Sequence, residues 1–170
     1  MDDIGALREQ VETLAARVQE LEDRQQIADL VAQYGPTVDS GSAEATAGLW
    51  TEDGTFDVLD TILMQGREQI AGMVTGEGHQ GLIKNGVAHV LTVPYIRQGG
   101  DQARGWSYAL NIRYDADADR FWVARVSAVT WELARTDEGW RITHRVNANL
   151  DGAEPPRQMF RGMITDGLSR

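Results

Sequence analysis

The second half of the chain places the strongest constraint on its fold, because it holds four long strand-like segments joined by short turns. The segments cover residues 87–98, 103–114, 121–136 and 140–150. Apolar and polar residues alternate in the second segment, which is typical of a strand with one buried face. Short turns between long strands favour antiparallel pairing. We therefore expect an antiparallel meander that forms one large sheet.

The first twenty residues predict a different structure, an amphipathic helix with a heptad stripe. Apolar residues recur at alternating steps of three and four: Ile4, Leu7, Val11, Leu14, Val18 and Leu21. An isolated helix would expose this stripe to water. We interpret residues 1–20 as an oligomerisation arm, and packing of the stripe against the protein's own domain is the alternative.

The helical pattern continues after Leu21 on a new face, formed by Ile27, Leu30, Val31, Tyr34 and Val38. Gly35-Pro36 should end or kink this helix, because proline lacks the amide hydrogen and crowds the preceding turn. Ser42 is the expected cap of a second helix that reaches Trp50.

Shorter elements are expected between this helical region and the sheet. Residues 55–58 and 62–65 predict a hairpin, and residues 67–74 predict a short helix. Residues 76–81 contain three glycines and are interpreted as a flexible loop, with His79 exposed on it. The formal G-x-G-x-x-G match in this loop follows a helix rather than a strand, so it does not indicate dinucleotide binding.

Helices that precede a large antiparallel sheet predict an α+β fold. We divide the chain into an N-terminal helical arm at 1–20, a main domain at 21–150 and a C-terminal tail with a short helix at 151–170. No linker within the main domain is long enough to separate two domains.

Composition and charge exclude several functional classes. The formal net charge is −10 and no basic cluster is present, so we expect neither nucleic-acid nor membrane-surface binding. The absence of cysteine excludes disulfides, thiolate metal sites and a cysteine nucleophile. No apolar run has the length of a membrane span. The N-terminus does not have the pattern of a signal peptide, so we expect a cytoplasmic protein.

Several short motifs, in this order and spacing, resemble the SnoaL-like branch of the nuclear-transport-factor-2-like superfamily. They are residues 21–27, Tyr34, Asp39, residues 49–54, residues 66–70, His89 and residues 139–142. The resemblance covers residues 21–150 and implies a cone-shaped fold, in which helices close over a strongly curved sheet and leave an apolar cavity. Members include dehydratases, dehydrochlorinases, polyketide cyclases and steroid isomerases, and also non-catalytic binding and assembly modules.

The same resemblance implies a catalytic group made of Asp39, His89, Tyr34 and Arg145. In the dehydratase members an aspartate at the end of the first long helix pairs with a strand histidine, and Asp39 and His89 match these positions. Imidazole can act as a base near neutral pH, and the aspartate would orient it. Tyr34 would donate to a leaving hydroxyl or an enolate oxygen, and Arg145 would hold developing negative charge.

The remaining site assignments concern substrate contact. Residues expected to line the pocket are Trp50, Phe56, Trp106, Tyr108 and His144. His144 and Arg145 are neighbours on one strand, so they should point to opposite faces unless a bulge intervenes. Scytalone dehydratase has a second histidine on the strand after the first, where this chain offers Trp106, Ser107, Tyr108 and Asn111.

From these residues we expect a cofactor-independent lyase or isomerase that acts on a hydrophobic small molecule such as a polyketide, an aromatic compound or a steroid. A non-catalytic binding or assembly module on the same fold is the first alternative, and a polyketide cyclase or epoxide-type hydrolase is the second. We expect no metal site and no cofactor. A homodimer or homotrimer is the expected assembly.

Overall fold

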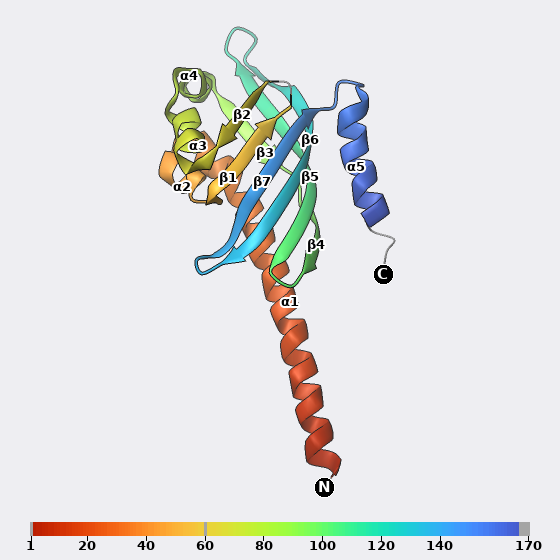
Figure 1. The fold of residues 1–170 in the computed structure, drawn as a ribbon. Coiled ribbons are helices and arrows are strands. Elements are labelled where there is room, and N and C mark those ends of the chain that lie inside the picture. The colour runs from red at the N-terminus through yellow and green to blue at the C-terminus, as the bar shows by residue number, and fades with distance from the viewer. Residues whose placement is uncertain (1, 60, 167–170) are drawn as a thin grey trace.

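The computed structural model describes residues 2–59 and 61–166 of the chain, which form helices, then a large sheet, then a last helix (Figure 1). The helices are α1 (Asp2–Asp39), α2 (Ala43–Ala47), α3 (Gly66–Thr75), α4 (Glu77–Asn85) and α5 (Glu154–Asp166). The strands are β1 (Trp50–Val58), β2 (Ile62–Gln65), β3 (Val87–Leu91), β4 (Tyr95–Gly99), β5 (Gln102–Asp115), β6 (Arg120–Thr136) and β7 (Gly139–Asn149).

The strands form one sheet in the order β2-β1-β7-β6-β5-β3, and β4 also pairs with β5. Only the pairing of β1 with β7 is parallel among the described strands. The predicted α+β class and the antiparallel meander of β5, β6 and β7 are confirmed. The segment 87–98 is two strands rather than one, and Pro94, which has no amide hydrogen for a sheet ladder, lies in the break between them.

Helix α1 is continuous from the arm into the domain (Figure 1). Its stripe residues from Ile4 to Leu21 are exposed, whereas Ile27, Val31 and Val38 are fully buried against the sheet. The stripe therefore does not pack against the described part of its own domain.

Of the two outcomes expected at Gly35-Pro36, an end or a kink, the helix end is contradicted, because α1 runs through Pro36 to Asp39. The hydroxyl of Thr37 donates to the carbonyls of Gln33 and Tyr34, which lie next to the turn that Pro36 disturbs. Gly35 is instead the point at which α1 comes close to β3. A Cβ on this residue would lie 2.1 Å from the carbonyl oxygen of His89, so only glycine lets α1 lie this near to β3.

Asp23 fixes α1 to the end of the sheet. This buried carboxylate accepts hydrogen bonds from Gln98 Nε2 at 2.6 Å and Trp140 Nε1 at 3.2 Å, and it forms an ion pair with Arg135. The Arg135 guanidinium holds the pKa of Asp23 well below its usual range, with the two neutral donors adding to the effect. One carboxylate thus joins α1 to β4, β6 and β7.

Two short elements differ from the predictions. The helix after Ser42 ends at Ala47, and Trp50 begins β1. Residues 76–81 are not a loop, because α4 begins at Glu77 and buries His79. The acidic Glu77 in its first turn and the basic Lys84 in its last turn complement the helix dipole, which favours a helix despite the glycines.

Helix α5 covers part of the sheet on the side away from α1 (Figure 1). The ring of Phe160 packs on Tyr108 with the centroids 4.8 Å apart. Within the described residues, no helix combines the length and apolarity that a bilayer crossing requires.

Candidate active site

The end of α1 and the start of the sheet meet at Asp39 and His89. Asp39 Oδ2 accepts the backbone N–H of His89 at 2.7 Å, and Asp39 Oδ1 lies 2.5 Å from His89 Nδ1. The close approach at Gly35 brings the carboxylate within reach of β3. The structure therefore brings together the two residues that the sequence predicts as a pair.

The neighbouring strand determines which nitrogen of His89 carries the proton. Arg113 Nε donates to Asn111 Oδ1 at 2.5 Å, so the Asn111 amide must turn its Nδ2 toward His89. Asn111 Nδ2 lies 2.8 Å from His89 Nε2 and can only donate. His89 Nε2 is therefore an acceptor, and Nδ1–H donates to Asp39. In this tautomer the lone pair of Nε2 accepts the Asn111 hydrogen bond and can act as a base once that bond is displaced.

Tyr34 is part of the buried core and also packs beside the Asp39–His89 pair. Its ring lies edge-on to His89, with the centroids 6.3 Å apart, and it lines the cavity described below. Trp50 and Phe56 pack against the ring of Tyr34. Phe56 also lines the cavity, whereas Trp50 is fully buried behind Tyr34 and is not among the lining residues.

His79 was missed by the sequence analysis as a site residue. Its side chain is buried, its ring centroid lies 5.6 Å from that of His89, and its Nε2 lies 2.8 Å from the carbonyl oxygen of Val38. Because a carbonyl can only accept, His79 Nε2 carries a proton. The hydrogen bond fixes α4 against the last turn of α1. The helical periodicity of residues 77–85 could have indicated that His79 is buried, but the glycines in this segment obscured it.

A cavity of about 350 Å³ is lined by His89 and by Asn111, which bonds to its Nε2. Its polar lining residues are Tyr34, His79, His89, Asn111, Arg113 and Arg125. Its apolar lining residues are Phe56, Val58, Ile62, Met64, Met73 and Leu82. The combination of an apolar wall with a few convergent polar groups is typical of a small-molecule site.

A second, more enclosed space of about 20 Å³ shares five lining residues with the first: Tyr34, Phe56, His89, Asn111 and Arg125. Arg145 lines this inner space and is 1% exposed. Its guanidinium carbon lies 3.8 Å from the centroid of the Tyr34 ring, and rings of Phe56 and Trp131 lie at 4.5 Å. Two basic side chains, Arg125 and Arg145, thus face a space that holds about one water molecule.

The charge of Arg145 is not neutralised by the protein around it. Its Nε donates to Asn147 Oδ1 at 3.1 Å, but its Nη1 has no hydrogen-bond partner among the described residues. No acidic residue lines either of the two cavities in the described part of the chain. Burial lowers the pKa of Arg145, and the neighbouring Tyr34 partly opposes this effect. A guanidinium stays charged in such a setting, so this site favours a negatively charged group.

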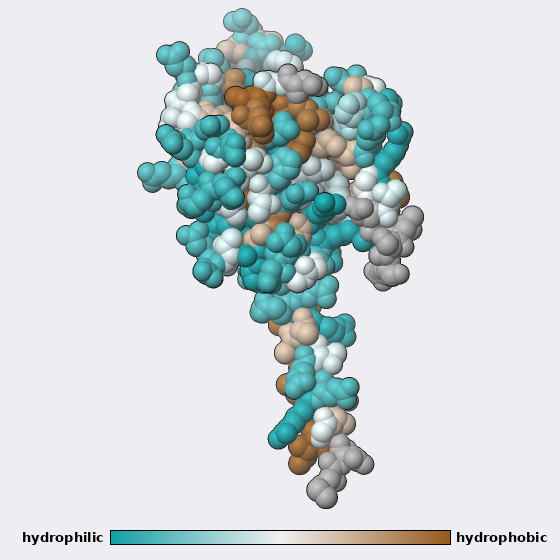
Figure 2. All heavy atoms as spheres, viewed as in Figure 1, coloured by the Kyte–Doolittle hydropathy of each residue, from teal (hydrophilic) through white to brown (hydrophobic). Residues whose placement is uncertain are grey.

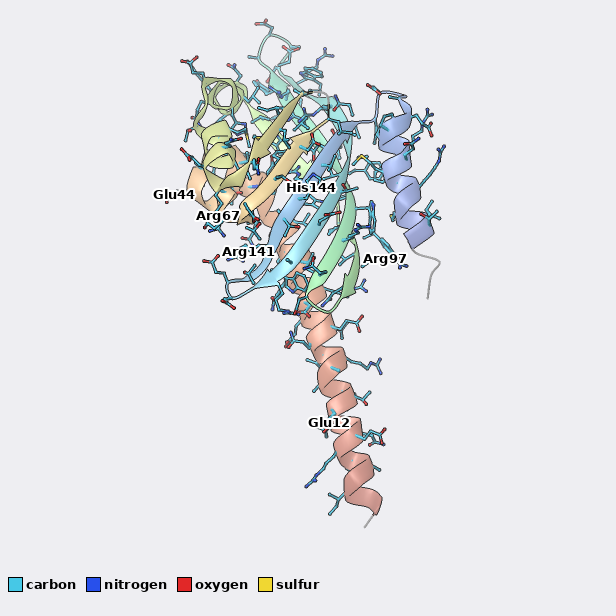
Figure 3. The ribbon with its side chains drawn as sticks, viewed as in Figure 1. Glu12, Glu44, Arg67, Arg97, Arg141 and His144 are labelled. Carbon is cyan, nitrogen blue, oxygen red and sulfur yellow. The ribbon has the colours of Figure 1, made fainter. Side chains whose placement is uncertain are left out.

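A bulge in β7 explains how Arg145 and Ile142 both point inward. The register against β6 shifts between the pairs Glu132–His144 and Leu133–Ile142, which reverses the alternation once. Arg145 then pairs with Trp131 on the inner face. His144 pairs with Glu132, lies on the face of the sheet away from α1 (Figure 3), and lines neither cavity.

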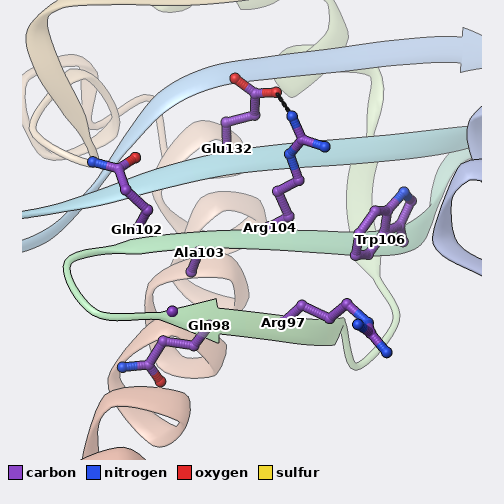
Figure 4. A pocket seen from close by; sticks show the side chains of 8 residues that line it. Arg97, Gln98, Gln102, Ala103, Arg104, Trp106 and Glu132 are labelled. Atoms are coloured by element: carbon purple, nitrogen blue, oxygen red, sulfur yellow. Dashed lines mark ion pairs between the residues drawn. The ribbon is translucent and has the colours of Figure 1, made fainter. Parts of the chain in front are cut away.

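Trp106 and Tyr108 also point away from the cavity. Asn111 on β5 faces His89, so the even-numbered residues before it point to the opposite side. Trp106 lines a groove of about 430 Å³ between β4 and β5, beside Arg97 and Arg104 (Figure 4). Tyr108 packs on α5. Of the residues predicted to contact substrate, only Phe56 therefore lines the cavity of His89.

Residues 19–146, most of the chain, match the family described as the SnoaL-like domain. The chain belongs to this family. The match and the fold together confirm the resemblance to the SnoaL-like and nuclear-transport-factor-2-like proteins. No curated protein matches the chain.

Solved structures share the fold of this SnoaL-like protein. A nuclear-transport-factor-2-like protein with a cystatin-like fold from Novosphingobium aromaticivorans is 40% identical, with a TM-score of 0.83 over 86% of this chain and 94% of that chain. A protein of unknown function from Mycobacterium tuberculosis is 21% identical, with a TM-score of 0.67 over 89% and 90%. A putative aromatic ring hydroxylase from Novosphingobium aromaticivorans is 26% identical, with a TM-score of 0.63 over 76% and 90%.

Proposed function

We propose that this SnoaL-like protein is a cofactor-independent lyase or isomerase that removes a proton from carbon next to a carbonyl group of a hydrophobic small molecule. One observation carries the proposal: the hydrogen-bond chain Asp39–His89–Asn111 leaves an unprotonated imidazole nitrogen at the wall of a largely apolar cavity. Abstracting such a proton needs a positioned base and a way to stabilise the enolate that forms.

In the proposed reaction, His89 Nε2 takes the proton and the carbon–hydrogen electron pair becomes the enolate. Asp39 accepts the Nδ1 hydrogen bond and stabilises the imidazolium that forms, the role an aspartate has in other histidine dyads. Asn111 donates to Nε2 before substrate binds, so the substrate must displace this amide. Catalytic hydrogen bonds often reach their productive geometry only when the substrate is bound.

The inner end of the cavity suits the oxygen of the enolate. Arg145 is buried without a neutralising carboxylate, and Tyr34 lies against it. Negative charge that develops at this end would be stabilised by a donor already in place, in buried surroundings. In a dehydration, the His89 imidazolium gives its proton to the β-hydroxyl, which leaves as water while the enolate electrons form the new carbon–carbon double bond and restore the carbonyl group. In an isomerisation, the imidazolium returns the proton to another carbon.

The cavity limits the substrate class. Its volume of about 350 Å³ is near the lower end of the usual range for small-molecule sites, about 300–1,000 Å³. Its wall is apolar and its inner end is cationic. We propose a flat hydrophobic compound that carries a ketone, such as an aromatic polyketide or a ketosteroid.

Deuterium exchange tests this function before the natural substrate is known. Candidate β-hydroxy ketones, anthrone-type aromatics and 3-ketosteroids are incubated with the protein in D2O, and NMR follows deuterium uptake at the carbon next to the carbonyl. We expect uptake with the wild type for at least one class. His89→Gln should reduce it by roughly 10²–10⁴-fold.

His144→Gln is the matched control, because it changes a histidine that lies on the opposite face of the sheet. Equal losses in His89→Gln and His144→Gln would contradict the proposed base. Tight binding of a compound without any deuterium uptake would favour a non-catalytic binding module. The engagement of Nε2 by Asn111 is the observation that supports that alternative.

A further inference from the structure

The arm of α1 carries an apolar stripe that the described part of its own domain leaves uncovered. The stripe residues are between 51% and 66% exposed: Ile4, Leu7, Val11, Leu14, Val18 and Leu21. Figure 1 shows the arm extending away from the sheet, and Figure 2 shows apolar side chains along it. An apolar stripe of this length in water requires a partner.

The residue types along the stripe indicate what that partner is. Three β-branched residues, Ile4, Val11 and Val18, occupy the first core position of each heptad. Leucines occupy the second core position each time. β-Branched residues at the first position with leucine at the second favour a parallel two-stranded coiled coil over trimers and tetramers.

The residues beside the stripe agree with this arrangement. In a parallel pair, the residue directly before a first core position faces, on the partner helix, the residue directly after the next second core position. Arg17 and Glu22 occupy such positions, so Arg17 of one chain would face Glu22 of the other, and both are exposed. The charges are of opposite sign and therefore favour the parallel register.

A membrane surface fits the arm less well. Helices that lie on membranes carry many lysines and arginines on their polar face. The polar face of this arm is mixed and contains Glu9, Glu12 and Glu20 beside Arg8 and Arg17. Its apolar stripe is also the narrow seam of a coiled coil rather than a broad face.

We infer that two copies of this chain associate through their arms as a parallel two-stranded coiled coil. The paired segment from Ile4 to Leu21 is about 26 Å long. Because α1 is continuous and Asp23 bonds to β4, β6 and β7, each arm is rigidly joined to its domain. Parallel arms place both domains at the same end of the coiled coil.

Sedimentation velocity over a wide range of concentrations tests the association with the full chain. The wild type should be a dimer at high concentration. Leu14→Glu places a charge in the middle of the stripe and should weaken the dimer at least tenfold. Ala16→Glu adds the same charge on the opposite side of the helix and should leave the dimer unchanged. A wild-type monomer at every concentration, a trimer, or an unaffected Leu14→Glu dimer would each overturn the inference.

Single cysteines test the orientation cleanly, because the chain has none of its own. In a parallel pair each stripe residue faces its own copy, so Leu7→Cys alone should form a disulfide dimer, and so should Val18→Cys alone. In an antiparallel pair position 7 faces position 18. A mixture that yields only the crosslink between positions 7 and 18 would overturn the parallel arrangement. A monomer that binds anionic vesicles would replace the second copy with a membrane.

Discussion

Asp39 holds His89 at two points, through the backbone N–H and through the ring Nδ1. One carboxylate thus joins β3 to α1 and accepts the Nδ1–H of the tautomer that Asn111 selects. The arrangement depends on Gly35, four residues earlier in the helix, because any side chain there would collide with the His89 carbonyl.

The tautomer of His89 can be measured without a substrate. We expect ¹⁵N NMR of the wild type to show Nδ1 protonated and Nε2 unprotonated. Asp39→Asn removes the negative charge that would stabilise the imidazolium, so proton abstraction by Nε2 becomes harder. Turnover should fall by roughly 10²–10⁴-fold. A wild-type imidazole with its proton on Nε2 would contradict the assigned hydrogen-bond chain.

Asn111→Asp replaces the amide donor at Nε2 with a carboxylate acceptor. The variant imidazole should carry a proton on Nε2, because the new carboxylate can only accept a hydrogen bond there. Activity should fall, because Nε2 would no longer have a free lone pair. ¹⁵N NMR of the imidazole locates the proton, and an Nε2 that stays unprotonated would show that Asn111 does not contact this nitrogen.

Gly35→Ala should destabilise the fold by about 1–3 kcal/mol, because the new Cβ would lie 2.1 Å from the His89 carbonyl oxygen. Gly72→Ala is the control: its Cβ would meet nothing within 4 Å, and alanine is the better helix former by about 0.5–1 kcal/mol. Urea denaturation of both variants checks the prediction. Equal free energies of unfolding would mean that α1 and β3 are not in close contact.

Asp23→Asn should lower the free energy of unfolding by about 3 kcal/mol at neutral pH, because it leaves Arg135 without its buried partner. The pKa of Asp23 is lowered in the fold, so its contribution is complete above about pH 4 and is lost as the pH falls below that value. The difference between wild type and variant should therefore shrink in acid. A difference that stays constant down to pH 2 would assign the effect to packing.

Arg145→Met should raise the free energy of unfolding by about 1–2 kcal/mol while reducing binding of anionic ligands. The substitution removes a buried charge that the described residues do not neutralise, at a position surrounded by Tyr34, Phe56 and Trp131. Arg104→Met changes an arginine paired with Glu132 away from the cavity and should have little effect on binding. A strong loss of stability in Arg145→Met alone would indicate a purely structural arginine.

The sequence predicted the meander and the pairing of Asp39 with His89 because these depend on local patterns and on positions shared with the family. It could not show that α1 continues through Pro36, since tertiary packing decides that outcome. The glycines around His79 concealed α4. The bulge before His144 could not be read from alternation, yet it decides which of His144 and Arg145 faces inward.

Because α1 is unbroken, the number of residues between the arm and Asp39 determines how the arm is oriented relative to the candidate active site. The exposed stripe ends at Leu21, and the carboxylate that holds His89 is at Asp39 on the same rod. Each residue turns a helix by about 100° and advances it by about 1.5 Å. Inserting one residue directly after Leu21 would rotate the arm relative to Asp39 by that angle while leaving the buried residues from Asp23 onward in place. The number of residues in this stretch therefore sets the rotation of the arm relative to Asp39. Natural variants should change this number only in whole heptads.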